Sequence, residues 1–274
     1  MCRFLKPRST RTPRARAGMT LLELLLASSI MAIMAGVLGG LALSVQMQSE
    51  HSEGQGEAVQ HARVVIDRMQ RLMNEANASE SFPGFLVLTE TVGGNTFPDT
   101  VVIWTAAAPL YPNALPLWKE VTVICPDSQT PNLLWEITTP ADSSPVPALT
   151  DTALWRTKLA ALKTSSTAVK TELTTLLRTA DAGNSQRRGA IRFDIRKRPS
   201  DEQWTAYKPP FNQIGWADLD WVQGIYGSRT GLRQVWCRME LQLMPGANAA
   251  VEDPTGQSAL TFFGSAAVYH EMHK

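Results

Sequence analysis

The feature that most constrains this chain is an apolar run near its N-terminus, long enough to cross a membrane. Between Met19 and Val45 the only ionisable side chain is that of Glu23, and Leu, Ala, Met, Ile and Val dominate. A helix needs about 20 mostly apolar residues to span a bilayer core. The apolar part of a secretory signal peptide is shorter, roughly 7–15 residues. The run therefore predicts a membrane helix that is retained.

The residues before this run are basic. The first eighteen residues contain no acidic side chain, and their basic residues are Arg3, Lys6, Arg8, Arg11, Arg14 and Arg16. Basic residues that flank a membrane span tend to remain on the cytoplasmic side. We therefore expect a single-pass protein of the inner (cytoplasmic) membrane, with a cytoplasmic N-terminus and a periplasmic or otherwise extracytoplasmic head.

Glu23 is unusual in such a run. A carboxylate at mid-bilayer costs about 2.5–3.5 kcal/mol on insertion scales, so it usually has a partner. Glu23 could simply reach the cytoplasmic interface. Alternatively, a cut between Gly18 and Met19 would make it the fifth residue of a new chain. It could then pair with the new amine, its own or a neighbour's, and a carboxylate in the first turns of a helix is also favoured by the helix dipole.

The hexapeptide GMTLLE, residues 18–23, follows a basic leader and precedes a long apolar helix. It resembles the prepilin cleavage/methylation motif of type IV pilins and of the pseudopilins of type II secretion systems. The resemblance implies that prepilin peptidase removes residues 1–18 after Gly18 and methylates the amine of Met19. It also implies that Glu23 registers one subunit against the next in a filament. Met19 stands where the family usually has Phe, but methylation concerns the backbone amine.

Helical periodicity continues after the apolar run, so residues 19–78 are expected to form a transmembrane and stalk helix. Gly54 and Gly56 predict a hinge or a flexible stretch of helix. Apolar residues then recur at spacings of three and four, which predicts a core-facing stripe. The stripe consists of Val59, Ala62, Ile66, Met69 and Met73.

Residues 79–274 are expected to form a head of mainly antiparallel β structure, which gives an α+β fold with the long helix packed on the head. Stretches rich in β-branched and aromatic residues occur at 84–90, 100–104, 119–125, 133–138, 190–196, 233–244 and 259–269. Within 233–244 apolar and polar residues alternate, as in a strand with one buried face. Apolar residues at helical spacing predict a helical insertion at about 150–180. This insertion is expected to pack internally; a lid or a partner-binding arm is the alternative.

Residue patterns typical of enzymes are weak. His270 and His273 in HEMHK are one residue too close for a zincin motif, and no phosphate loop or G-x-S-x-G is present. We therefore expect no catalytic activity, no cofactor and no metal site. The net charge of +1 argues against a nucleic-acid partner bound by bulk charge. The aromatic residues Trp204, Trp216, Trp221, Tyr226 and Trp236 are expected to be core, with a binding face as the alternative.

Cleavage after Gly18 would remove Cys2 and leave Cys125 and Cys237 in the mature chain. An even number of cysteines in an oxidising compartment is compatible with a disulfide. Both lie in predicted strands, so the pair is a candidate bridge.

These observations together favour a structural subunit. We expect a minor pseudopilin or pilin-like subunit of a type II secretion or type IV pilus-like filament, which contacts other subunits or cargo. The bulky head with insertions is similar to that of a J-type minor pseudopilin. The alternative is a membrane-anchored extracytoplasmic binding or sensor module that does not polymerise.

Overall fold

The computed structural model of the chain describes residues 19–92, 94–105, 115–183, 186–245 and 259–274. It divides into two compact units, Met1–His51 and Ser52–Lys274, and the boundary falls within the first helix. The helices are α1 (Leu21–Asn74), α2 (Thr152–Thr164) and α3 (Asp201–Tyr207), with short 3-10 helices at Trp118–Glu120, Trp216–Asp218 and Val222–Gly224. Residues 51–58, where two glycines predicted a hinge, are helical.

Two antiparallel sheets and a hairpin form the second unit. The strands are β1 (Phe85–Val92), β2 (Asn95–Trp104), β3 (Val121–Pro126), β4 (Leu134–Thr138), β5 (Val169–Thr174), β6 (Thr179–Gly183), β7 (Gln186–Gly189), β8 (Ile191–Arg198), β9 (Thr230–Leu243) and β10 (Leu260–His273). One sheet has the order β1-β2-β3-β4-β5, the other has the order β10-β9-β8, and β6 pairs with β7. The predicted α+β class, with a mainly antiparallel head, is confirmed.

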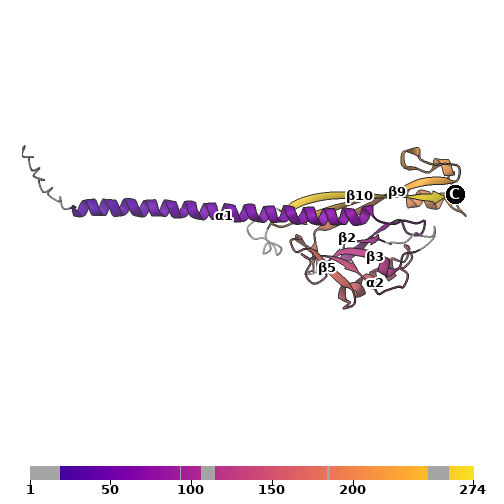
Figure 1. Cartoon of the computed structure of the whole chain (residues 1–274), viewed down its shortest axis with the longest axis horizontal. Coiled ribbons are helices and arrows are strands. Elements are labelled where there is room, and N and C mark those ends of the chain that lie inside the picture. The colour runs from indigo at the N-terminus through magenta and orange to yellow at the C-terminus, as the bar shows by residue number, and fades with distance from the viewer. Residues whose placement is uncertain (1–18, 93, 106–114, 184–185, 246–258) are drawn as a thin grey trace, which may run out of the picture. The chain divides into compact units, whose positions relative to one another are not determined.

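The second half of α1 is built into the core of this unit. Figure 1 shows β9 and β10 on one side of the helix and β2, β3 and β5 on the other. The buried helix residues are Ala58, Ala62, Val65, Met69, Leu72 and Met73. The predicted stripe is therefore correct at three positions and wrong at Val59, whose side chain is 48% exposed. Arg68 fixes the helix to β4 by donating two hydrogen bonds, of 2.9 and 2.6 Å, to the Glu136 carboxylate.

The opposite face of the five-stranded sheet carries a second core, which α2 covers. Trp155 and Leu159 of α2 lie in one hydrophobic cluster with Trp118 and with side chains from β2 and β3. The ring centroids of Trp118 and Trp155 are 5.3 Å apart in an edge-on arrangement. Because β2 and β3 have a core on both faces, their residues are buried continuously instead of alternately.

The helical insertion expected at 150–180 is only half correct. Helix α2 begins after Asp151, whose carboxylate accepts a hydrogen bond from the Leu154 amide, and it ends at Thr164. The chain then returns as β5, which pairs with β4 at the edge of the five-stranded sheet. Backbone pairing with β4 overrides the helical spacing of the apolar residues after 164.

Candidate processing and assembly site

The start of α1 is closed by a capping box formed by Thr20 and Glu23. The Thr20 amide donates to the Glu23 Oε2 at 3.0 Å, and the Glu23 amide donates to the Thr20 Oγ1 at 3.3 Å. The Thr20 hydroxyl also donates to the same carboxylate oxygen at 3.2 Å, and the Thr20 carbonyl accepts from the Leu24 amide at 3.2 Å. Two amides that lack a helical partner are thus satisfied reciprocally.

This geometry gives Glu23 a local partner within its own chain. The carboxylate lies at the positive end of the helix dipole, where an acid is stabilising.

Sequence reasoning identified Glu23 but missed Thr20. The signal was present, because a threonine three residues before a glutamate and next to an apolar run is a capping-box pattern.

The helix that follows is suited to a membrane. From Leu24 to Ser49 no residue is ionisable, and the large apolar side chains from Leu24 to Met47 are all exposed in the isolated chain. Within the part of the chain that the structure describes, α1 is the one helix long and apolar enough to cross a bilayer. Met19, the first described residue, directly precedes this helix start, whereas Gly18 lies outside the described residues.

The N-terminal residues match a known family model. The model of the prokaryotic N-terminal methylation motif matches residues 13–39. The chain carries the type IV pilin and pseudopilin signature. The signature implies processing by a prepilin peptidase and assembly with pilin-type subunits, and with α1 it marks a single-pass membrane anchor. Searches of curated proteins and of solved structures found no match to this chain.

The candidate disulfide is absent from the structure, where Cys125 and Cys237 are free thiols. Cys125 belongs to the cluster beneath α2, and Cys237 belongs to the cluster around α1. The five-stranded sheet separates these clusters, which explains why the sulfurs do not meet. Burial raises the pKa of the Cys125 thiol to about 11 and that of the Cys237 thiol to about 12. Both thiols are therefore neutral and unreactive at physiological pH.

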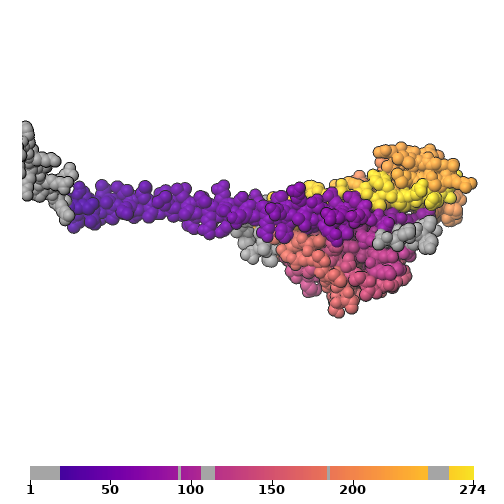
Figure 2. Space-filling model, in the orientation of Figure 1, coloured from indigo at the N-terminus to yellow at the C-terminus, as the bar shows by residue number. Residues whose placement is uncertain are grey.

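The aromatic residues expected in the core divide into two groups. Trp204, Trp216 and Trp221 are buried together with Met272 of β10, and Tyr226 stacks on Trp221 with 6.5 Å between ring centroids while remaining 45% exposed. This cluster joins the segment between β8 and β9 to the C-terminal strand, and the space-filling view shows the two as one continuous surface (Figure 2). Trp236 is not part of it; the guanidinium of Arg196 lies 5.9 Å from its ring centroid.

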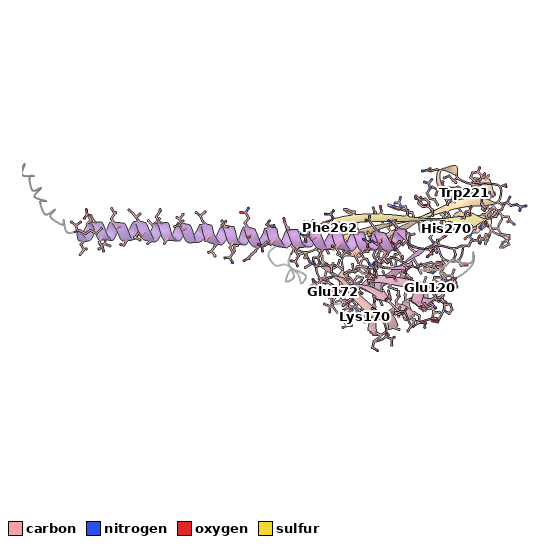
Figure 3. All side chains as sticks on the ribbon, in the orientation of Figure 1. Glu120, Lys170, Glu172, Trp221, Phe262 and His270 are labelled. Carbon is pink, nitrogen blue, oxygen red and sulfur yellow. The ribbon has the colours of Figure 1, made fainter. Side chains whose placement is uncertain are left out.

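The HEMHK segment is the end of strand β10 and not a metal-binding helix. His270 is buried and His273 is exposed, so the two imidazoles are in different environments. Figure 3 marks the positions of His270 on β10 and of Trp221 in the aromatic cluster. Among the described residues, no group of three or more His, Cys, Asp or Glu side chains is placed to hold a metal ion.

Proposed function

We propose that this protein is a minor pseudopilin or pilin-like subunit of a type II secretion or type IV pilus-like filament. The observation that carries the proposal is the methylation signature at residues 13–39. It coincides with an apolar helix whose first turn is formed by the Thr20–Glu23 box and whose apolar side chains are exposed in the isolated chain. Such a surface needs a lipid or protein environment, and both are available to a filament subunit.

The size and elaboration of the head support a minor subunit similar to the J type. The α2 insertion between β4 and β5 and the aromatic segment between β8 and β9 enlarge the sheets beyond simple hairpin connections. In this proposal residues 1–18 are removed, residues 19–78 serve as anchor and stalk, and residues 79–274 form the head outside the inner membrane. Its partners are the prepilin peptidase, other pilin or pseudopilin subunits, and cargo.

Glu23 in this proposal pairs with the methylated amine of a neighbouring subunit and so sets the register of assembly. The capping box offers a simpler role, because it already satisfies the carboxylate within one chain. Substitutions can separate these roles. Glu23→Gln keeps an oxygen that accepts from the Thr20 amide and removes the charge. Thr20→Ala keeps the charge and removes the hydroxyl that caps the helix, at a cost of about 1 kcal/mol in helix stability.

The experiment is crosslinking and co-purification of the wild-type chain, Glu23→Gln, Glu23→Leu and Thr20→Ala with sibling pilin-type subunits. All four chains should be processed and inserted, since none alters the cleavage residue. We expect recovery with siblings to fall for both Glu23 variants and to persist for Thr20→Ala. Wild-type recovery by Glu23→Gln would reduce Glu23 to a helix cap. A processed wild-type chain that recovers no sibling would instead favour the anchored, non-polymerising module.

A further inference from the structure

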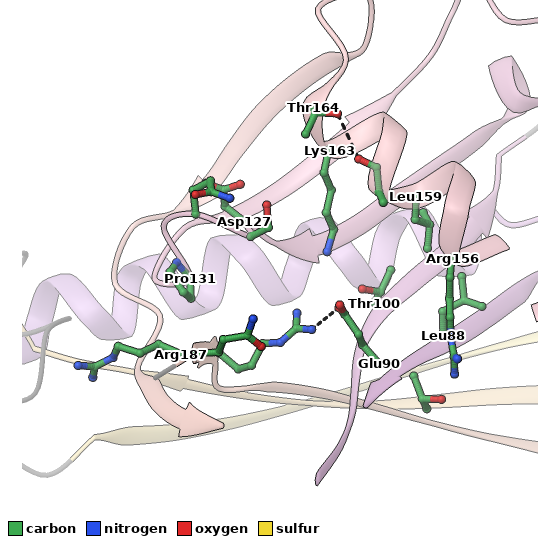
Figure 4. Close-up of a pocket in the computed structure, with 16 residues that line it drawn as sticks. Leu88, Glu90, Thr100, Asp127, Pro131, Arg156, Leu159, Lys163, Thr164 and Arg187 are labelled. Carbon is green, nitrogen blue, oxygen red and sulfur yellow. Dashed lines mark hydrogen bonds and ion pairs between the residues drawn. The ribbon is translucent and has the colours of Figure 1, made fainter. Parts of the chain in front are cut away.

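A cleft with a volume of ≈ 740 Å³ opens between α2 and the first strands of the five-stranded sheet. Its walls come from five places in the chain: β1, β2, α2, β7 and the turn after β3 (Figure 4). This volume is within the range of about 300–1,000 Å³ that is typical of ligand pockets. The cleft lies entirely in the second unit and has no part in the N-terminal signature.

Two irregular features of the fold create the cleft. The pairing of β1 with β2 shifts register between Leu88 and Glu90, where Pro98 and Asp99 of β2 lie opposite Thr89 alone, and Thr89 lines the cleft. Bulges of this kind are common next to functional sites, because they redirect side chains. The α2 insertion then places Arg156, Leu159 and Lys163 along the opposite wall.

The arginines of β7 are already engaged. The guanidinium of Arg188 forms ion pairs with Glu90 and with the buried Asp99, the latter at 3.4 Å. Arg187 donates to the Thr179 hydroxyl at 3.1 Å. The ion pairs of Arg188 hold β7 against the five-stranded sheet and leave little of its charge for a ligand, whereas the neutral Thr179 hydroxyl orients Arg187 without cancelling its charge.

The cations of α2 are different. In the described part of the chain, neither the guanidinium of Arg156 nor the ammonium of Lys163 forms an ion pair or a hydrogen bond. Figure 4 shows the amine of Lys163 directed from α2 into the cleft. Of the two carboxylates on the wall, Glu90 is paired with Arg188, and Asp127 accepts a hydrogen bond from the Thr130 amide. The side chains that line the cleft include the four cations of Arg156, Lys163, Arg187 and Arg188 and these two carboxylates, so their net charge is +2.

Apolar surface accompanies these charges. Leu88, Pro131 and Leu159 line the same cleft. A small inorganic anion would leave this surface uncovered, whereas a peptide covers it with its Cβ atoms and backbone. We propose that the cleft binds a short acidic polypeptide segment of a partner, whose carboxylates pair with Arg156 and Lys163. Carboxylate–guanidinium hydrogen bonds are charge-assisted and among the strongest available to a protein surface.

This inference deepens the proposed function, since it rests on the protein meeting a cargo or a sibling subunit through its head. The test measures binding alone. The probe is a fluorescein-labelled peptide of alternating glutamate and alanine, titrated by fluorescence anisotropy with the full mature chain in detergent micelles. The same peptide with glutamine in place of glutamate reports any binding that does not need carboxylates.

The variants are Arg156→Glu and Lys163→Glu, with Lys158→Glu as the matched control. Lys158 is exposed on the same helix and does not line the cleft, so it gives the same change of charge elsewhere. We expect each cleft variant to weaken binding about tenfold or more, as the loss of one charge-assisted pair implies. Lys158→Glu should remain within about twofold of wild type, because an exposed charge outside the contact adds little.

Three results would overturn the inference: equal binding of the glutamine peptide, equal weakening by Lys158→Glu, or complete displacement of the peptide by an equimolar amount of inorganic phosphate. The last would identify a site for small anions. Tryptophan fluorescence of each variant checks the fold, and Arg156→Gln repeats the test with a milder change. Because no step depends on cleavage or assembly, failure here leaves the pilin-type function standing. An uncleaved chain that still binds the peptide would support the acidic-peptide site and contradict the pilin-type function.

Discussion

The buried His270 makes the stability of the head depend on pH in a defined direction. Its side chain is 8% exposed, and neither ring nitrogen has a hydrogen-bond partner among the described residues. Arg233 stands opposite it in the β9–β10 register and is held by the Pro199 carbonyl and by Asp201. Burial, together with the positive charges of Arg233 and Lys197, lowers the pKa of His270 to about 4.

The sign follows from proton linkage. The unfolded chain binds a proton on this imidazole below its ordinary pKa of about 6.5, whereas the folded chain does so only below about 4. The free energy of unfolding of the head therefore carries no penalty from His270 above pH 6.5, and it falls as the pH is lowered. The slope is about 1.4 kcal/mol per pH unit, so the total loss by pH 4 is about 3 kcal/mol.

Urea unfolding of the mature chain in detergent micelles at pH 7, 6 and 5 measures this effect. All eight tryptophans lie between residues 104 and 236, so their fluorescence reports on the head. His270→Leu removes the titrating group, and its stability relative to wild type should rise by about 2 kcal/mol between pH 7 and pH 5, since every other group cancels in the comparison. His273→Leu, at an exposed position of the same strand, is the control. Parallel wild-type and His270→Leu curves would refute the reasoning.

Further predictions concern glycines and thiols. A Cβ at Gly189 would overlap the side chain of Leu177, so Gly189→Ala should destabilise the head by about 1–3 kcal/mol in urea unfolding. Gly56 lies on α1 with open space around it, so Gly56→Ala should stabilise the chain by about 1 kcal/mol. The opposite order of the two stabilities would contradict the structure. Cys125 and Cys237 should resist iodoacetamide in the native chain and both react after unfolding without any reductant, because they are buried free thiols. No labelling before reduction would reveal a disulfide.

The strands with the strongest local signals could be predicted from the sequence. In β9 every second residue from Val235 to Leu243 is apolar, and these side chains are all buried. In β2 and β3 the continuous apolar runs also indicated strands, because their buried residues serve two cores. Strands with a strong sequence pattern are thus predicted correctly when tertiary packing and local preference agree.

The predictions from sequence were wrong where tertiary contacts determine the local structure. β5 is an edge strand with mostly exposed polar positions, so its sequence lacks alternation and its few apolar residues fitted a helix. The stripe on α1 was displaced because neighbouring apolar residues, such as Val64 and Val65, allow two overlapping faces. Only the packing against both sheets selects the face that contains Val65.

The candidate site was identified from residue order, but its geometry was not. Glu23 is conspicuous because charge is rare in apolar runs. The reciprocal bonds with Thr20 depend on the backbone at the helix start. The cleft beside α2 could not be predicted from the sequence, since its residues come from five separated segments.

The mass of the mature chain tests the central claim most directly. The protein would be purified from membranes of cells with an active prepilin peptidase and its intact mass and N-terminus determined. A pilin-type subunit predicts residues 19–274 with an N-methylated Met19, and a bulky substitution at Gly18 should leave the leader attached. A wild-type chain that retains residues 1–18 in those cells would contradict the account.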